Sequence, residues 1–136
     1  MSDDQQNAAR APTIVVVDDE SSIRNGLSSL LQDEAYLVHC AQNGKEGLHL
    51  VKSILPDLVI TDFMMPEMSG KELARAMKAD ASLAQIPIIL MTGAHLAEDS
   101  ERNALFLRVL QKPFSAPVLL KETSAVLKIV RLATSK

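Results

Sequence analysis

The feature that most constrains the fold is a short run of β-branched residues without polar alternation. Thr13-Ile14-Val15-Val16-Val17 is apolar at every position after the first. A strand with one face in water alternates apolar and polar side chains, whereas a parallel strand covered on both faces does not. We therefore predict that residues 13–17 form a strand of a parallel sheet that is buried on both faces.

Similar short apolar runs recur along the chain, separated by segments with helical periodicity. Further strands are predicted at residues 37–41, 58–61, 86–91 and 108–110. Helices are predicted over the stripe of Ile23, Leu27, Leu30 and Leu31, after Asn43 and Ser69, over residues 98–105, and from about residue 116. Strands that alternate with helices at this spacing indicate a parallel sheet with right-handed crossovers and helices on both faces.

Length and composition fit one globular domain. The chain has 136 residues, of which 47% are hydrophobic and 23% are charged, as in ordinary globular proteins. The net charge of -3 gives no basic surface for nucleic acid, and no apolar stretch is long enough to span a membrane. Cys40 is the only cysteine, and we predict that it packs in the core of the strand at residues 37–41. A reducing cytoplasm is the expected location.

Acidic residues follow two of the predicted strands. Asp18-Asp19-Glu20 comes directly after the strand at 13–17, and Asp62 directly after the strand at 58–61. Ligands of such sheets bind beyond the carboxyl ends of the strands, so these carboxylates are expected to converge at one edge. Acids at close range repel one another, and a hard cation such as Mg²⁺ relieves the repulsion. Taken alone, residues 18–20 would equally suit a solvated loop that caps the next helix.

A hydroxyl and an ammonium group are predicted at the same edge. Thr92 ends the fourth apolar run beside Gly93, and Lys112 follows the fifth run, directly before Pro113. Thr92 can donate a hydrogen bond there, and the Lys112 ammonium can pair with a phosphoryl oxygen. A nucleophilic carboxylate, a metal pair, a hydroxyl and an ammonium are the parts that phosphoryl transfer requires.

These motifs resemble those of the receiver domain of two-component response regulators, the CheY-like family, over residues 13 to 132. The resemblance rests on residues 16–20, 56–66, 69–70, 91–93 and 112–114. It implies a flavodoxin-like, doubly wound five-stranded parallel α/β sheet with strand order 2-1-3-4-5 and five helices. It also implies a cis peptide bond between Lys112 and Pro113.

The same resemblance implies the role of each site residue. Asp62 is the phosphoacceptor, Mg²⁺ is held by Asp18, Asp19, Asp62 and the backbone carbonyl of Met64, and the phosphoryl group is contacted by Thr92 and Lys112. The phosphoryl group would come from a phosphohistidine of a sensor histidine kinase or histidine phosphotransfer protein. The chain would then change its surface for a downstream protein target or output domain, as a monomer or weak dimer without direct contact to nucleic acid or membrane. It would be an enzyme only in catalysing its own phosphorylation and dephosphorylation.

The chain departs from the family pattern in the segment that relays the signal. Val109 stands three residues before Lys112, near the position where family members carry an aromatic switch residue, and the segment between Thr92 and Lys112 is shorter than is common. We therefore expect a short or irregular fourth helix, with Phe106 or Leu107 filling part of the space of the aromatic side chain. An apolar patch would form nearby if the last helix exposed Leu119 or Val126.

Several alternatives stay open at this point. The missing aromatic residue suggests a phosphorylation-independent receiver-like interaction module, and acids after the first strand with a distal lysine would also suit a small metal-dependent phosphohydrolase. His95, three residues after Thr92, is placed where it could tune dephosphorylation. Residues 1–12 are predicted to be a disordered leader and residues 133–136 a tail. The sequence leaves open whether the chain is a single-domain regulator or the receiver of a longer protein.

Overall fold

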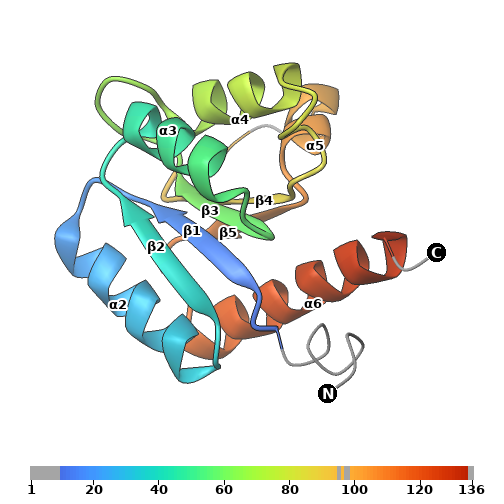
Figure 1. Ribbon diagram of the computed structural model, residues 1–136. Coiled ribbons are helices and arrows are strands. Elements are labelled where there is room, and N and C mark those ends of the chain that lie inside the picture. Colours follow the sequence, from blue (N-terminus) through green and yellow to red (C-terminus); the bar gives the residue numbers. More distant parts are fainter. Residues whose placement is uncertain (1–9, 95, 97–98, 135–136) are drawn as a thin grey trace.

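The computed structural model describes residues 10–94, 96 and 99–134, and these form one parallel sheet with helices on both faces (Figure 1). The sheet order is β2-β1-β3-β4-β5, which confirms the predicted flavodoxin-like arrangement. The prediction of a disordered leader falls largely on residues 1–9, outside the described residues. The strands are β1 (Thr13–Val17), β2 (Leu37–Ala41), β3 (Leu58–Asp62), β4 (Ile88–Thr92) and β5 (Arg108–Gln111).

Two layers of helices cover the sheet. In Figure 1, α2 (Ser21–Asp33) and α6 (Ala116–Thr134) lie below the sheet, whereas α3 (Gly44–Ile54), α4 (Gly70–Ala79) and α5 (Ser100–Leu105) lie above it. Alternate residues of β1 therefore enter two cores. Ile14 and Val16 pack on the side of α2 and α6, and Val15 and Val17 pack on the opposite side. None of the described helices is long and apolar enough to cross a membrane.

Two helices begin where the capping patterns predict. The Asn43 side chain accepts a hydrogen bond from the Glu46 amide at 2.8 Å. Ser69 and Glu72 form a reciprocal capping box, with distances of 3.1 Å and 3.0 Å between side chains and amides. These caps satisfy amide groups that a helix leaves without a partner in its first turn. They fix the start of α4 directly after the loop that follows Asp62.

The region between β4 and β5 contains the short helix that the sequence predicts. The helix α5 has 6 residues and begins after Asp99, whose side chain accepts a hydrogen bond from the Arg102 amide at 2.8 Å. Phe106 is buried at 6% exposure, whereas Leu107 is 39% exposed. The prediction that either residue fills the space of the missing aromatic side chain stays open for Phe106 and loses support for Leu107.

Two strand predictions need correction. β4 begins at Ile88 and not at Ile86, because Pro87 lacks an amide donor and lies in the turn before the strand. Cys40 is exposed, so the prediction that it packs in the core is wrong. β2 is an edge strand of the sheet, and helices on both faces cover it less completely than the central strands. Apolar composition alone does not reveal an edge position.

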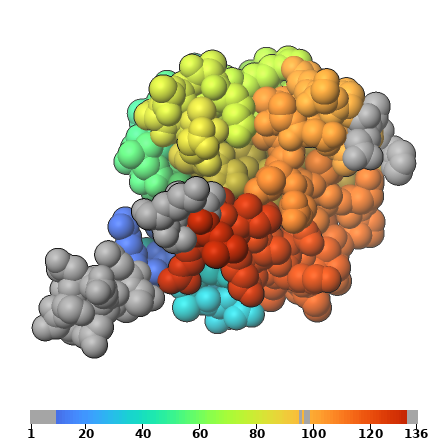
Figure 2. Space-filling model, turned by 90° about the vertical axis from the view of Figure 1, so that its right-hand side faces the viewer, coloured from blue at the N-terminus to red at the C-terminus, as the bar shows by residue number. Residues whose placement is uncertain are grey.

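The condition for an apolar patch on the last helix, exposure of Leu119 or Val126, is not met. Leu119 and Val126 are fully buried because they face the sheet. The large apolar side chains that this part of the chain exposes are Leu107, between α5 and β5, and Val118, Ile129 and Leu132 of α6. Figure 2 shows this side of the molecule, where the segment with α5 and β5 (orange) lies beside α6 (red).

Candidate functional site

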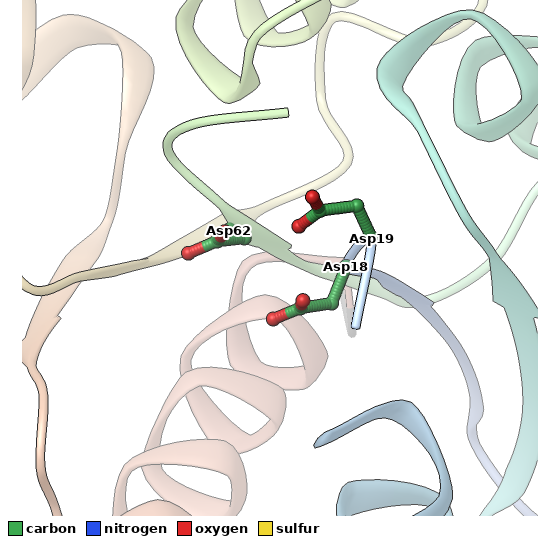
Figure 3. A group of neighbouring side chains, drawn as sticks. All are labelled: Asp18, Asp19 and Asp62. Atoms are coloured by element: carbon green, nitrogen blue, oxygen red, sulfur yellow. The ribbon is translucent and has the colours of Figure 1, made fainter. Parts of the chain in front are cut away.

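Three carboxylates meet at the carboxyl end of the sheet. Asp18 and Asp19 follow β1 and Asp62 ends β3, so two adjacent strands supply them. One carboxylate oxygen of each residue lies within 4.8 Å of those of the other two, and the three groups face a common space (Figure 3). Asp18 is fully buried, Asp62 is 9% exposed and Asp19 is exposed. The predicted convergence is confirmed for Asp18, Asp19 and Asp62, and Glu20 does not belong to this cluster.

The main-chain and side-chain polar groups of Asp18 form hydrogen bonds. Its amide donates to the Ala41 carbonyl at 3.1 Å, and one carboxylate oxygen accepts from the Glu20 amide at 2.9 Å. Its main-chain carbonyl accepts a hydrogen bond from the Arg24 side chain at 2.7 Å. The buried acid therefore has one well-defined orientation, which preorganises it as a ligand.

Lys112 reaches the carboxylates from β5. Its Nζ lies 3.0 Å from Oδ1 of Asp62 and 3.5 Å from Oδ2 of Asp18. The backbone places it, because the Lys112 amide donates to the Thr92 carbonyl at 2.7 Å and the bond to Pro113 is cis, as predicted. The ammonium thus lies where negative charge accumulates.

Electrostatics couple these groups. Burial raises the pKa of Asp18; the Glu20 amide opposes this rise, and the charge of Asp62 adds to it. Burial alone would lower the pKa of Lys112, but its hydrogen bond to Asp62 and the charges of Asp18 and Asp62 raise it above its ordinary value. Three carboxylates face a single ammonium group, so the cluster favours additional positive charge.

The end of β3 is packed tightly against the start of α4. Asp62 is followed by a loop that returns at Gly70, whose amide donates to the Phe63 carbonyl at 2.9 Å. A Cβ atom at Gly70 would overlap the carbonyl oxygen of Asp62. Only glycine allows this close approach of two backbone segments. Ser69-Gly70 therefore fixes the main chain at the candidate phosphoacceptor.

Thr92 and Met64 are less closely tied to the acids. Thr92 is 2% exposed at the end of β4, and its hydroxyl accepts a hydrogen bond from the Ala94 amide at 3.0 Å. In the described part of the chain it bonds to no carboxylate. The Met64 side chain is 69% exposed, and a role for its carbonyl stays a prediction. His95 lies outside the described residues.

The donor set fits Mg²⁺. Three carboxylates from rigid strand ends offer hard oxygen ligands close together, and the exposed Asp19 side leaves room for water or phosphoryl oxygens. Mg²⁺ takes one or two carboxylates, waters and phosphate oxygens in an octahedral arrangement. The repulsion among the three acids is the physical reason for a cation here.

Arg24 is a contributor that the sequence patterns did not identify. It lies on α2, outside every motif quoted above, yet its side chain bonds to the Asp18 main chain. The sequence does contain one indication of its role. A cation near the amino end of a helix opposes the helix dipole and is therefore unfavourable unless it has another function.

Comparison with known proteins agrees with this geometry. A family model described as the response regulator receiver domain matches residues 14–124. PilH of Pseudomonas aeruginosa is 31% identical over 120 residues, which are 84% of this chain and 96% of that protein. PhoB, the phosphate regulon transcriptional regulatory protein of the same organism, is 36% identical over 119 residues, 85% of this chain and 52% of that protein. Hybrid signal transduction histidine kinase D of Dictyostelium discoideum is 34% identical over 136 residues, 97% of this chain but 8% of that protein.

The solved structures point the same way. The chemotaxis protein CheY4 of Vibrio cholerae matches with a TM-score of 0.80 and 33% identity, over 86% of this chain and 99% of that one. A CheY-like response regulator receiver domain protein from Methanospirillum hungatei matches with a TM-score of 0.82 and 27% identity, over 91% of this chain and 99% of that one. Both likenesses extend over most of the fold described above.

The relatives differ in how much of them this chain represents. It spans nearly all of PilH, about half of PhoB and a small part of the hybrid kinase. A match to part of a larger protein identifies the domain and not the activity of the whole. The acidic cluster of Asp18, Asp19 and Asp62 is typical of a receiver Mg²⁺ site and consistent with a phosphorylation site. Sequence, fold and site together place the chain in the response regulator receiver domain family, the CheY-like receivers of two-component signalling.

Proposed function

We propose that this receiver domain accepts a phosphoryl group on Asp62 from a phosphohistidine and thereby changes its surface for a partner. The observation that carries the proposal is the convergence of three carboxylates within 4.8 Å with the Lys112 ammonium 3.0 Å from Asp62. Asp18, Asp19, Asp62 and the Met64 carbonyl would hold Mg²⁺. When bound, the ion supplies charge that offsets the developing negative charge of the phosphoryl oxygens.

The transfer needs little covalent chemistry from the protein. A carboxylate oxygen of Asp62 attacks phosphorus, the bond from phosphorus to the donor imidazole nitrogen breaks, and the donor histidine keeps the electron pair and takes up a proton. Lys112 pairs with a phosphoryl oxygen, and Thr92 donates a hydrogen bond to another. Hydrolysis reverses the modification: water attacks phosphorus, orthophosphate leaves and the Asp62 carboxylate is restored. These roles are positioning and electrostatic stabilisation.

The surface change would begin at Thr92. Its hydroxyl is engaged with Ala94, so a hydrogen bond to the phosphoryl group requires it to leave that contact. The segment that follows leads through α5 and the exposed Leu107 to β5. Phosphorylation would shift the population of conformers of this segment. Because Val109 stands near the position of the aromatic switch residue, the conformational change in this chain would not use an aromatic side chain at that position.

A groove beside the site suits the phosphodonor protein. It has a volume of about 560 Å³ and lies between α2 and the segment from Lys112 to Leu119. Apolar side chains such as Ile23, Leu30 and Phe114 line it, and Lys112 stands at its edge. A sensor histidine kinase or histidine phosphotransfer protein docked here would have its histidine close to Asp62. We therefore propose these donors as partners, together with a downstream target or output domain.

The remaining organisation is part of the same proposal. Residues 13–132 would constitute the receiver domain, with residues 1–12 as a leader and residues 133–136 as a tail. We propose a cytoplasmic location, because that is where receiver domains usually meet their kinases. The chain would act as a monomer or weak dimer, without direct binding to nucleic acid or membrane.

The proposal is tested by titrating beryllofluoride, a phosphoryl mimic, into the protein with Mg²⁺ while following amide NMR shifts. We expect saturable shifts at residues 18, 19, 62, 92 and 112 that disappear in Asp62→Asn. Asp33→Asn is the matched control, because Asp33 is an exposed acid at the end of α2 and the variant changes charge equally. Shifts that spread into residues 99–111 would indicate a working switch.

The same titration decides between the proposal and its alternatives. Absence of any response in the wild type would overturn the switch and leave a phosphorylation-independent interaction module, which the missing aromatic at Val109 favours. Multiple turnover of a generic phosphate ester would instead support a phosphohydrolase. Binding of beryllofluoride with Mg²⁺ confined to the site, without spread beyond Thr92, would support phosphorylation but contradict the proposed surface change.

A further inference from the structure

Arg24 occupies an unusual position at the beginning of α2. A cation near the amino end of a helix opposes the macrodipole. Glu20 at the N-cap position of α2 makes no side-chain cap, and the first turn holds no acidic residue. By contrast, α3 and α4 each begin with a side-chain cap and a glutamate. A residue that breaks a local rule is expected where function requires it.

The side chain of Arg24 reaches back to the acidic loop. Its Nη1 donates to the main-chain carbonyl of Asp18 at 2.7 Å in a partly buried environment. Long helical side chains point toward the amino end of the helix, so this contact follows from the position of Arg24 on α2. The carbonyl belongs to the peptide group that joins Asp18 to Asp19. Arg24 therefore fixes the plane of that peptide group.

Asp19 depends on this peptide group more than Asp18 does. The Asp18 carboxylate is held directly by the Glu20 amide and Lys112. The exposed Asp19 carboxylate has no hydrogen bond or ion pair to any residue that the structure describes, yet it belongs to the acidic cluster. The direction of its side chain is set by the main chain that precedes it. A peptide group free to rotate would let Asp19 leave the cluster.

We propose that Arg24 is a positioning residue for the Mg²⁺ site, which orients the Asp18–Asp19 peptide group so that Asp19 faces the other two carboxylates. The inference rests on the Mg²⁺ site of the proposed function. Arg24 touches a ligand residue and not the metal, and partners of this kind typically change metal affinity about tenfold or more when they are removed. The Asp19 carboxylate would thus already have its metal-binding orientation before Mg²⁺ binds.

The sign of the effect separates positioning from simple electrostatics. A guanidinium near the site repels Mg²⁺, so removal of its charge alone would strengthen Mg²⁺ binding. Loss of positioning would weaken it. A positioning role therefore predicts a change opposite to the one that charge predicts.

The test is a Mg²⁺ titration of the full chain, followed by amide NMR shifts of residues 18–20, for wild type, Arg24→Met, Arg24→Lys and Arg108→Met. We expect Arg24→Met to raise the dissociation constant about tenfold and to speed amide exchange of residues 19 and 20 in metal-free protein. Arg24→Lys, which keeps a donor without the planar fork, should raise the constant less than Arg24→Met does. Arg108→Met is the matched control, because Arg108 also donates to a main-chain carbonyl but lies on β5, away from the acids.

The outcomes are distinguishable. Mg²⁺ binding by Arg24→Met as tight as in wild type, or tighter, would overturn the inference and leave the proposed function standing. Should Arg24→Met fail to fold, a dissociation constant of Arg24→Lys no higher than that of wild type would overturn it equally. A wild-type protein that binds no Mg²⁺ would overturn both the inference and the site on which it rests.

Discussion

The acidic edge of the sheet and the segment between β4 and β5 are held in different ways. At the acidic edge, the buried or partly buried Asp18, Asp62 and Lys112 meet at the ends of β1, β3 and β5, and Asp18 has a partner at each of its polar groups. In the other segment, the polar contacts lie at the surface: exposed ion pairs join Glu101 of α5 to Lys71 and Arg75 of α4, beside the buried Leu105 and Phe106. Buried, connected groups define one geometry, whereas exposed pairs contribute little to stability.

This difference suits a switch. In the proposed switch, the site of phosphoryl transfer would have to keep its groups in place, while the segment that would respond to phosphorylation would have to change conformation at small cost. Variants at the acidic edge should therefore alter chemistry or folding strongly. Variants of the α5 segment should leave chemistry nearly intact and alter the response.

The largest effect is expected for Lys112→Met. It removes the ammonium that lies 3.0 Å from Asp62, so phosphorylation by a small phosphodonor should slow about 100-fold, or by about 2.7 kcal/mol in the barrier. Mg²⁺ should bind at least as tightly, because a competing cation is gone. Lys128→Met, an exposed lysine on α6, serves as the control. Equal rates in wild type and Lys112→Met would contradict the role of the lysine.

Gly70→Ala tests how closely the backbone is packed at the acidic edge of the sheet. The added Cβ would overlap the Asp62 carbonyl oxygen, so we expect a loss of about 1–3 kcal/mol in the free energy of unfolding by urea. Gly26→Ala is the matched control, since a Cβ there meets no atom within 4 Å on the exposed side of α2. It should stabilise the protein by about 0.5–1 kcal/mol. If Gly70→Ala also stabilised the protein, the loop after Asp62 would have to move aside to accommodate the added Cβ atom.

The acidic edge was also the region that sequence predicted best. Asp18, Asp19 and Asp62 directly follow apolar runs, and parallel topology forces such positions to one end of the sheet. The run at residues 13–17 lacks alternation because both faces are covered, and this pattern fixed the central strands. The prediction that Cys40 is buried failed, because it depends on which strand lies at an edge. The burial of Leu119 and Val126 was left open, because it depends on which face the helix turns inward. Local periodicity does not encode those choices.

Contacts across the sequence were equally hidden. The bond of Arg24 to the Asp18 carbonyl involves a main-chain acceptor, which has no sequence signature. The contact of the Thr92 hydroxyl with Ala94 depends on the conformation of a loop. The short α5 was predicted from segment length, yet its ion pairs with α4 join residues far apart in the chain. Motif spacing therefore identified which groups are present, and the structure was needed to show which of them are engaged.

Thr92→Ala should separate chemistry from response. It removes the hydroxyl proposed to move from Ala94 to the phosphoryl group, so beryllofluoride should bind about tenfold more weakly, as expected for one lost hydrogen bond to a charged group. Amide shifts in residues 100–111 should disappear even at saturation. Thr92→Ser keeps the hydroxyl and should restore both. Undiminished shifts in this segment of the alanine variant would mean that the signal leaves the site by another route.

The smallest effect is expected at the exposed contact between α4 and α5. Hydrogen bonds from Arg75 and Lys71 lower the pKa of Glu101 from 4.5 to about 2. A lowered pKa in the folded state stabilises the fold above the ordinary pKa, and this contribution is lost as pH falls toward about 2. The urea midpoint of wild type should therefore exceed that of Glu101→Gln slightly at pH 6, and the difference should shrink steadily below about pH 4.5.

Salt and the phosphoryl mimic complete this last test. Because the pair is exposed, about 1 M salt should remove most of the difference in urea midpoint. Glu101→Gln should bind beryllofluoride as tightly as wild type but show altered amide shifts across α5, since it loosens the reporting segment and leaves Asp62 untouched. A large loss of stability, or a large loss of beryllofluoride binding, would mean that α5 is an integral part of the acidic edge and not a separately held element.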